Sequence, residues 1–183
     1  MDSLSERKKQ SLPFEVLLDQ KRIAARVAEL GQEISRDYAD REPILIGVLK
    51  GCVVFLADLI RHIDIQMQVE FVSAASYRQG FSQDDTVTLN GGFSVSLRSR
   101  HLLLVEGIVD TGKTFLTIVK RLSQLEPASI EIVTLLDKPA SHRSRIDMKY
   151  KGFSIGNEFV IGYGLDNAQK YRNLPYIGRV IDR

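Results

Sequence analysis

The stretch from Leu102 to Leu125 constrains the fold of this chain more than any other, because it combines three local signals. It consists of an apolar run long enough for a buried strand, a turn of acids, hydroxyls and glycines, and then apolar residues at helical spacing. A glycine-rich turn that opens a helix exposes unpaired backbone N–H groups and the positive end of the helix dipole. The stretch therefore predicts a strand, a loop and a helix that together bind an anion.

The loop inside this stretch also satisfies a known nucleotide-binding pattern. The letters GIVDTGKT, from Gly107 to Thr114, match the Walker A pattern G-x-x-x-x-G-K-[ST]. A P-loop kinase or NTPase is therefore one hypothesis, in which Lys113 reaches the β and γ phosphates and Thr114 ligates Mg²⁺. Asp137, at the end of a later apolar run, is then the candidate for a second metal-binding acid.

Two acids beside the loop favour a different ligand. Asp110 would place a carboxylate close to polyanionic phosphates, which is repulsive unless it faces a hydroxyl, a metal or a proton to be removed. Only about seventy residues follow the loop, which leaves little chain for a P-loop nucleotide fold. A ligand with one terminal phosphate on a sugar would instead bring hydroxyls and a metal beside Glu106 and Asp110. The residues of the loop alone leave both interpretations open.

Strand and helix patterns alternate along most of the chain. The run ILIGVL, from Ile44 to Leu49, is nearly continuous in apolar residues, as is typical of a parallel strand covered on both faces. The alternation predicts an α/β fold with a central parallel twisted sheet flanked by helices. Ligands gather at the carboxyl ends of such strands, where Lys50, Glu106 and Lys138 fall. Further strands are expected at 13–18, 66–73 and 129–137, and helices at 20–38 and 52–63.

Length and composition indicate a single domain over residues 1–183, because a chain that is 44% hydrophobic can bury one substantial core at this length. Residues 1–12 are polar and predict a flexible tail. The turn-rich stretch at about 75–95, which contains Asn90-Gly91-Gly92, predicts a mobile hairpin lid, with an ordinary surface hairpin as the alternative. The short-stranded, glycine-punctuated residues at about 150–183 predict a small C-terminal hood.

Charge and hydropathy argue against several classes of partner. The 25 Lys and Arg and the 23 Asp and Glu are scattered without a basic stripe, so no nucleic-acid partner is expected. No apolar run approaches the ~18 residues of a membrane span, and the polar start lacks a secretory signal. We therefore expect a cytoplasmic protein with no membrane partner. Cys52, the single cysteine, lies in an apolar run and is expected to be a buried hydrophobe.

Five motifs along the chain point to one family. They are GVLKG at 47–51, SY at 76–77, VEGIVDTGKT at 105–114, LLDKP at 135–139 and FVIGYGLDNAQKYRNLPYIG at 159–178. Together they resemble the bacterial-type hypoxanthine-guanine phosphoribosyltransferases, of the type I phosphoribosyltransferase family, over nearly the whole chain from about Phe14. The resemblance implies purine salvage, in which hypoxanthine and/or guanine displaces pyrophosphate from phosphoribosyl pyrophosphate (PRPP) with Mg²⁺, giving IMP or GMP. It also implies a homodimer or homotetramer.

The resemblance also implies roles for individual residues. Asp110 looks like the acid near purine N7, the candidate general base, a role that requires hydrogen-bond reach. Leu49 and Lys50 match a position at which the family often has a non-proline cis peptide. Ser76 and Tyr77 match the lid, whose closure would protect an oxocarbenium-like centre from water. The other implied contacts are PRPP with Glu106, Gly107, Ile108, Val109, Asp110, Thr111, Gly112, Lys113 and Thr114; pyrophosphate with Leu49, Lys50, Gly51 and Arg172; the purine with Lys138 through its O6, Phe159 by stacking, Val160 through its backbone and Asp166; and Mg²⁺ with Glu106 and Asp166.

Two positions depart from the family pattern. The family usually carries two adjacent acids at the end of this strand, whereas this chain has Glu106 followed by Gly107, so one carboxylate is missing. A non-catalytic sensor of PRPP or nucleotides is therefore a third hypothesis. The family often has an arginine about four residues beyond Lys138, where this chain has His142, and the adjacent Arg143 is a candidate replacement. An active transferase is favoured because Asp110, Lys138, Phe159, Asp166 and Arg172 are all present together.

Overall fold

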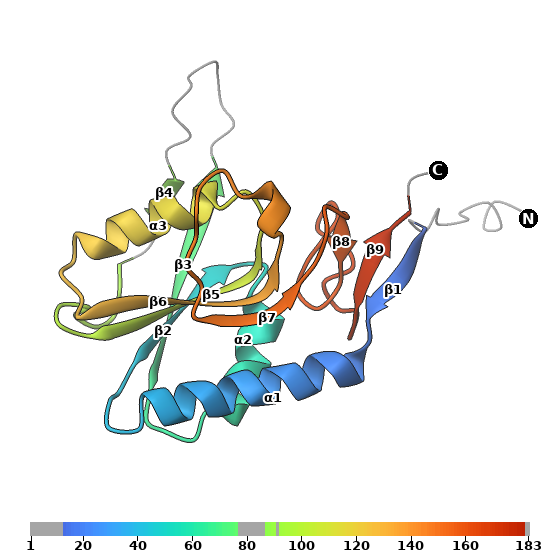
Figure 1. Ribbon diagram of the computed structural model, residues 1–183. Coiled ribbons are helices and arrows are strands. Elements are labelled where there is room, and N and C mark those ends of the chain that lie inside the picture. Colours follow the sequence, from blue (N-terminus) through green and yellow to red (C-terminus); the bar gives the residue numbers. More distant parts are fainter. Residues whose placement is uncertain (1–12, 77–86, 91, 182–183) are drawn as a thin grey trace, which may run out of the picture.

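The computed structural model describes residues 13–76, 87–90 and 92–181, which form two β-sheets and three α-helices (Figure 1). The larger sheet has the strand order β4-β3-β2-β5-β6-β7. The five strands β3-β2-β5-β6-β7 pair in parallel with their neighbours. Strand β4 pairs antiparallel with β3 at one edge. The predicted central parallel sheet is therefore confirmed. Its strands are β2 (Ile44–Leu49), β3 (Gln68–Ser76), β4 (Val87–Asn90), β5 (His101–Val109), β6 (Ser129–Asp137) and β7 (Tyr150–Ser154).

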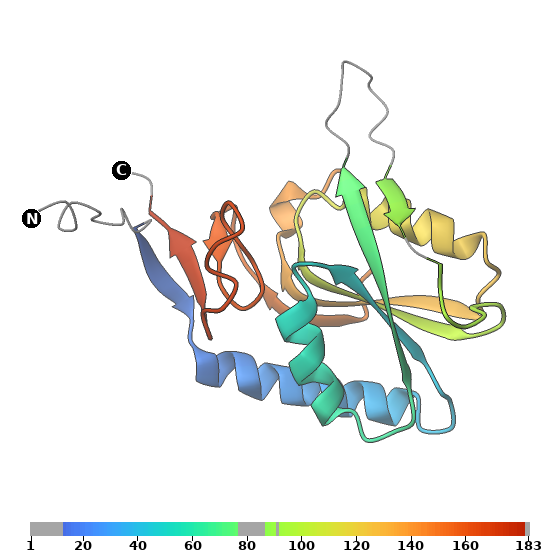
Figure 2. The same cartoon turned by 180° about the vertical axis from the view of Figure 1, so that it is seen from behind.

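Helices cover both faces of this sheet because its central strands are apolar on both sides. In β5, Leu103 and Val105 belong to the core cluster that contains the buried residues of α1 (Gln20–Asp37) and α2 (Val53–Leu59). The alternate residues Leu102 and Leu104 belong to a second cluster with α3 (Lys113–Ser123). The period-two alternation of a strand thus builds two cores, with α1 and α2 on one face and α3 on the other (Figures 1 and 2).

The two helices before β3 show how well local signals set their limits. The carboxylate of Asp19 accepts a hydrogen bond from the backbone N–H of Arg22 at 2.9 Å, which caps α1 at the predicted start. The helix expected at 52–63 is shorter than predicted. It forms α2 as far as Leu59 and then tightens into a 3₁₀ turn, η1 (Ile60–His62). Within the described residues, no helix is both long enough and apolar enough to cross a membrane.

A second, three-stranded sheet joins the two ends of the chain. Its antiparallel order is β1-β9-β8, formed by β1 (Phe14–Leu18), β9 (Ile177–Val180) and β8 (Val160–Ile161). The sheet stands apart from the larger one, beyond the start of α1 (Figure 1). It differs from the hood expected at about 150–183 in two ways, because β1 is part of it and residues 150–154 are not.

The reason for the second difference is the close approach of β7 to β6. A methyl group at Gly152 would lie 2.4 Å from the carbonyl oxygen of Leu135, so only glycine lets these backbones meet. Phe153 then packs against the core cluster of α1 and α2. A lone glycine within a short, polar strand gave no sequence signal of membership in the main sheet.

The hairpin expected at about 75–95 has its base in β3 and β4. These strands pair antiparallel from Ser73 opposite Asn90 to Ser76 opposite Val87. β3 is shifted by two to three residues towards the hairpin from the strand predicted at 66–73. Residues 77–86, with Tyr77 among them, lie outside the described residues, so the lid stays a prediction.

Candidate active site

The loop between β5 and α3 forms the expected anion cradle. Gly112 precedes the first helical residue of α3 with a φ of 78°, a left-handed conformation that glycine adopts without strain. Gly112 has no side chain to cap this helix, and the N–H of Lys113 donates to the hydroxyl of Thr111 only over 3.5 Å, so the first turn is suited to bind an anion. A pocket of about 130 Å³ lies there, lined by Glu106, Ile108, Val109, Asp110, Thr111, Gly112, Lys113, Thr114 and Phe115. Eight of the nine predicted PRPP-binding residues therefore line one pocket, and the exception is Gly107.

Asp110 and Lys138 meet at the carboxyl edge of the sheet. Parallel pairing of β5 with β6 sets Val109 opposite Asp137, so the next residue of each strand emerges side by side. The Nζ atom of Lys138 lies 3.4 Å from Oδ2 of Asp110, and the backbone N–H of Lys138 donates to the carbonyl of Val109. The lysine side chain is 7% exposed and the aspartate is 52% exposed. The buried ammonium group of Lys138, a donor, and the exposed carboxylate of Asp110, an acceptor, thus lie side by side.

This pair matches one edge of a 6-oxopurine. Ring nitrogen N7 and exocyclic O6 lie next to each other on that edge of the base. A lysine donates to the oxygen, and a carboxylate accepts a proton from the nitrogen. The spacing of Asp110 and Lys138 therefore allows both contacts with one ring, next to the phosphate cradle.

The residue before Lys138, Asp137, is a buried carboxylate that lies close to two basic side chains. Asp137 is 1% exposed, and its two carboxylate oxygens lie 2.8 Å from Nε2 of His142 and 3.2 Å from Nζ of Lys151. His142 thus faces inward, under the loop that carries Lys138. Arg143 is exposed, and its backbone N–H donates to the carbonyl of Thr111 in the phosphate loop. Of the two residues at the position of the family's usual arginine, Arg143 is the one exposed beside the phosphate loop.

The turn after β2 brings together most of the predicted pyrophosphate contacts. The peptide between Leu49 and Lys50 is cis, as the family resemblance implied. The Nζ atom of Lys50 lies 3.5 Å from Oε1 of Gln169, and the same oxygen lies 3.3 Å from a guanidinium nitrogen of Arg172. Arg172 also pairs with Asp166 at 2.7 Å. Lys50, Arg172 and Asp166 therefore lie close together around Gln169 and Arg172.

Gln169 was missed by the sequence interpretation. It bridges the two cations but is a neutral side chain inside a loop, and no motif letter marks its role. Its φ of 64°, together with positive φ at Ala168 and Tyr171, folds this segment back on itself. That conformation, which side chains rarely adopt, is visible only in the structure.

Glu106, in β5, is one of the residues that line the pocket at the start of α3. Burial raises the pKa of its carboxyl group to about 8, and the backbone N–H groups of Gly107 and Ile108 offset only part of this effect. The N–H of Gly107 lies 3.1 Å from a carboxylate oxygen of Glu106. No cation is recorded within salt-bridge distance of this carboxylate among the described residues. Glu106 is therefore suited to meet a positive charge that arrives with the substrate.

The residues expected to hold a metal fit a cation that is shared with its substrate. No group of three or more His, Cys, Asp and Glu is gathered for a metal anywhere in the described part of the chain. Magnesium is commonly held by one or two carboxylates plus substrate phosphates and water, rather than by an all-protein cage. Glu106 and Asp166 supply two such carboxylates, the first beside the phosphate pocket and the second paired with Arg172.

The remaining predicted residues are placed less completely. The Phe159 side chain is 53% exposed and directly precedes β8, in which Val160 is buried. The hydroxyl of Ser141 donates to the side chain of Asn157, which links the loop after Lys138 to the segment before Phe159. No contact recorded for the described residues joins Phe159 to Lys138. Ser76 ends β3, and its side chain and the whole of Tyr77 lie outside the described part of the chain.

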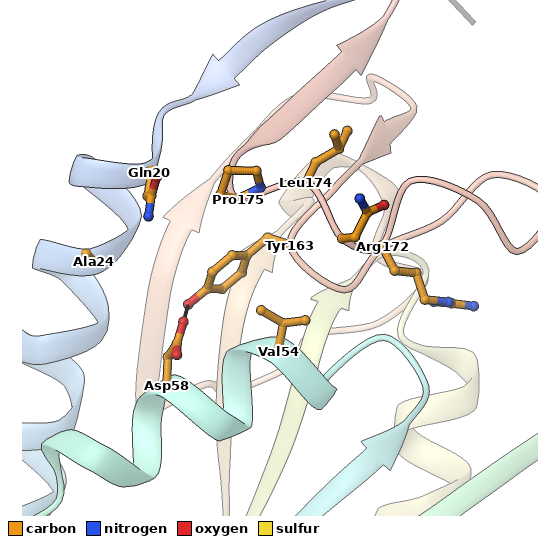
Figure 3. Close-up of a pocket in the computed structure, with 9 residues that line it drawn as sticks. Gln20, Ala24, Val54, Asp58, Tyr163, Arg172, Leu174 and Pro175 are labelled. Atoms are coloured by element: carbon orange, nitrogen blue, oxygen red, sulfur yellow. Dashed lines mark hydrogen bonds between the residues drawn. The ribbon is translucent and has the colours of Figure 1, made fainter. Parts of the chain in front are cut away.

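A cleft of about 250 Å³ lies between α1, α2 and the loop that follows β8 (Figure 3). At its centre the hydroxyl of Tyr163 donates to a carboxylate oxygen of Asp58 at 2.6 Å, and Asp58 also pairs with Arg61. Arg172 borders the cleft, but its guanidinium group points away from Tyr163 and Asp58 (Figure 3). In this cleft the hydrogen bond from Tyr163 to Asp58 fastens the loop after β8 to α2.

Comparison with known proteins places the chain in a family. Residues 14–168 match the model of the phosphoribosyl transferase domain. The chain belongs to the phosphoribosyltransferase family. It is 42% identical to the hypoxanthine phosphoribosyltransferase of Escherichia coli strain K12 over 169 residues, which cover 91% of this chain and 95% of that protein. It is 40% identical to the hypoxanthine-guanine phosphoribosyltransferase of Streptococcus pneumoniae strain R6 over 163 residues, or 89% and 91% of the two chains.

Solved structures of such phosphoribosyltransferases share the fold. A hypoxanthine phosphoribosyltransferase from Staphylococcus aureus superposes with a TM-score of 0.87 at 37% identity, covering 98% of this chain and 97% of that chain. The match to the family decides between the two interpretations of the loop. GIVDTGKT belongs to a phosphoribosyltransferase domain, and the P-loop kinase or NTPase is not favoured.

Proposed function

We propose that this phosphoribosyltransferase salvages purines by transferring the 5-phosphoribosyl group of PRPP to hypoxanthine, guanine or both. The observation that carries the proposal is the pair of Asp110 and Lys138, 3.4 Å apart at the edge of the phosphate pocket. Lys138 donates to O6 of the purine and Asp110 faces N7. A 6-amino purine would present a donor to the lysine, so adenine is the poorer substrate.

In the proposed reaction, a ring nitrogen of the purine bonds to C1′ of the ribose while the bond from C1′ to pyrophosphate breaks. As this bond forms, the base becomes positively charged, and Asp110 accepts or orients the N7 proton whose loss removes that charge. The backbone N–H groups at the start of α3, near Lys113 and Thr114, hold the 5′-phosphate. Lys50 and Arg172 receive the departing pyrophosphate. Phe159 stacks on the purine, and Val160 contacts it through the backbone.

Mg²⁺ is the proposed metal, bound by PRPP oxygens together with Glu106 and Asp166. The ion would neutralise charge on the pyrophosphate leaving group. A cation beside Glu106 also favours the ionised carboxylate, against the effect of burial on its pKa. The hairpin between β3 and β4, with Ser76 and Tyr77, is proposed as the lid over this centre. We also propose that residues 1–183 act as one domain, in the cytoplasm, as a homodimer or homotetramer.

The proposal is tested by measuring purine-dependent release of pyrophosphate from PRPP in the presence of Mg²⁺. Hypoxanthine, guanine, xanthine and adenine are compared in parallel, with ATP alone as a control for hydrolysis. We expect turnover with hypoxanthine or guanine and little with adenine. Failure to convert any purine at high enzyme concentration would refute the proposal.

A second candidate function, a non-catalytic sensor of PRPP, is motivated by Gly107. Such a sensor would bind PRPP, measurable by calorimetry, while the same preparation releases no pyrophosphate with any purine. The pairing of Asp110 with Lys138 argues against it, because a sensor of PRPP has no need of a purine edge.

A further inference from the structure

The backbone carbonyl of Gly51, in the turn between β2 and α2, is enclosed by two glycines from other parts of the chain. A methyl group on Gly107 would lie 2.7 Å from this oxygen, and one on Gly164 would lie 2.5 Å from it. Real β-carbons essentially never approach an oxygen so closely. The carbonyl therefore occupies the space that a side chain at either position would need.

A leucine fills the rest of this space. The Cδ2 atom of Leu165 would lie 3.2 Å from a methyl group on Gly107 and 3.5 Å from one on Gly51. Leu165 is itself buried, as is Gly107. The place where the family usually has its second acid is thus packed with a backbone carbonyl and an apolar side chain.

Backbone conformation does not explain the glycine at 107. Gly164 has a φ of 97°, so its conformation alone favours glycine. Gly107 is an ordinary strand residue of β5 and is not among the positive-φ positions. Its identity is therefore accounted for by the approach of Gly51.

A side chain at 107 would move the turn that receives pyrophosphate. To go from 2.7 Å to an ordinary contact of about 3.4 Å, the carbonyl of Gly51 would have to shift by about 0.7 Å. Lys50 directly precedes Gly51, and its carbonyl accepts a hydrogen bond from the N–H of Val53, so the turn moves as a unit. A shift of Gly51 would therefore displace Lys50 as well. Misplacing a binding group by ~1 Å can lower a rate on the order of 100-fold.

We propose that Gly107 is a positioning residue for the pyrophosphate turn, Leu49 to Gly51. By leaving room for the carbonyl of Gly51, it fixes where Lys50 and the backbone of the turn meet pyrophosphate. The inference rests on the proposed function and deepens it. Gly107 is then not only the position of a missing acid but also a residue that sets the place of the pyrophosphate turn. An aspartate at 107 would bring the same β-carbon to 2.7 Å from the carbonyl oxygen of Gly51 and would add a larger side chain that also needs room.

The test compares Gly107→Ala and Gly107→Asp with the wild-type protein. We expect the alanine variant to raise the KM for PRPP about tenfold and to weaken pyrophosphate binding, measured by calorimetry with Mg²⁺, by a similar factor. The KM for hypoxanthine should stay within about twofold, because the Asp110 and Lys138 edge is not displaced. Gly107→Asp should lose at least as much pyrophosphate affinity as Gly107→Ala.

Gly178→Ala is the matched steric control. A methyl group there would lie 2.7 Å from the ring of Phe14, an overlap of the same size but in the small sheet. It should lower the melting temperature without changing pyrophosphate affinity. Adding Leu165→Ala to Gly107→Ala should not restore that affinity, because the carbonyl of Gly51 remains in place.

Three results would overturn the inference. They are unchanged pyrophosphate affinity in a folded Gly107→Ala protein, tighter PRPP binding in Gly107→Asp, and recovery of affinity in the double variant. Loss of folding in Gly107→Ala would also overturn it, since the glycine would then serve stability. Failure of the proposed function shows separately, as absence of purine turnover in the wild-type protein, and the calorimetric comparison can still be made.

Discussion

At the scale of single residues, the two neighbouring aspartates Asp110 and Asp137 differ in how strongly they interact with nearby lysines. Lys138 lies 3.4 Å from Asp110, yet the aspartate is half exposed, so solvent weakens their attraction. Asp137, which is buried, accepts a hydrogen bond from Lys151 and lies 2.8 Å from Nε2 of His142. Asp110 thus stays available to a ligand while Asp137 holds the framework.

Replacing Asp110 with asparagine tests the proposed base. The amide keeps the shape of the side chain but cannot accept a proton as a carboxylate does, so kcat should fall about 100-fold or more. Binding of PRPP, measured by calorimetry, should change little because the backbone of the phosphate loop is retained. Turnover equal to that of the wild type would rule out this role for Asp110.

Glu106 should make the ligand-free protein less stable as pH rises. Its folded-state pKa of about 8 lies above the unfolded value of about 4.3, so the folded protein binds more protons between these values. The stability contributed by the protonated carboxyl is fully present below the unfolded pKa and is lost as pH rises through the folded pKa. Glu106→Gln should remove this dependence. Urea unfolding without metal at about pH 5 and pH 8 should show a decrease that is larger in the wild type by ~1 kcal/mol or more, and equal decreases would contradict the assignment.

Gln169 gives a prediction about pyrophosphate. Its side-chain oxygen lies 3.5 Å from Lys50 and 3.3 Å from Arg172, so Gln169→Glu would place a negative charge between two cations. This charge should compete with pyrophosphate and raise the KM for PRPP, by roughly tenfold at low salt and less at high salt. Gln169→Ala is the uncharged control, with a smaller effect. A KM that does not depend on the charge at 169 would show that the bridge is unrelated to binding.

At the scale of elements, the sequence predicted those whose signals are local. The stretch from β5 to α3 and the cap of α1 at Asp19 were predicted because apolar spacing and capping residues act within a few positions. The edge strand β7 and the pairing of β1 with β9 were not, since they depend on contacts far apart in sequence. Within the site, the motif letters led to Asp110, Lys138 and Arg172. They did not show that His142 turns inward or that Gly107 faces Gly51, because both depend on packing.

The fastening of the loop after β8 to α2 is testable through Tyr163. Its buried hydroxyl donates to Asp58, and burial together with this hydrogen bond raises the pKa of the phenol. Tyr163→Phe should lower the free energy of unfolding by about 1–2 kcal/mol and raise the KM for PRPP more than that for the purine. Asp58→Asn keeps an acceptor for the hydroxyl and should cost less. Identical PRPP kinetics in Tyr163→Phe would show that this hydrogen bond only stabilises the fold.

At the scale of the whole molecule, the proposed purine contacts come from both sheets, because Asp110 and Lys138 directly follow β5 and β6 of the larger sheet. The proposed PRPP cradle and the proposed pyrophosphate turn stand on this parallel sheet, whose central strands are packed on both faces. The proposed purine contacts at Phe159 and Val160 stand at β8, in the small sheet that β1 and β9 complete. Because β1 comes from the other end of the chain, purine binding should depend on residues that never touch the purine.

Removing β1 tests whether the small sheet supports purine binding more than it supports PRPP binding. A chain that begins at Gln20 lacks the strand that pairs with β9 from Phe14 opposite Val180 to Leu18 opposite Ile177. Two short strands alone are marginally stable, so β8 should lose its fixed position. We expect the KM for hypoxanthine to rise by about tenfold or more, while calorimetry still detects PRPP binding within a few-fold of the intact protein. A chain that begins at Pro13 keeps β1 and should retain both affinities. If the shorter chain loses PRPP affinity as strongly as purine affinity, the small sheet supports the whole site and the separation proposed here is wrong.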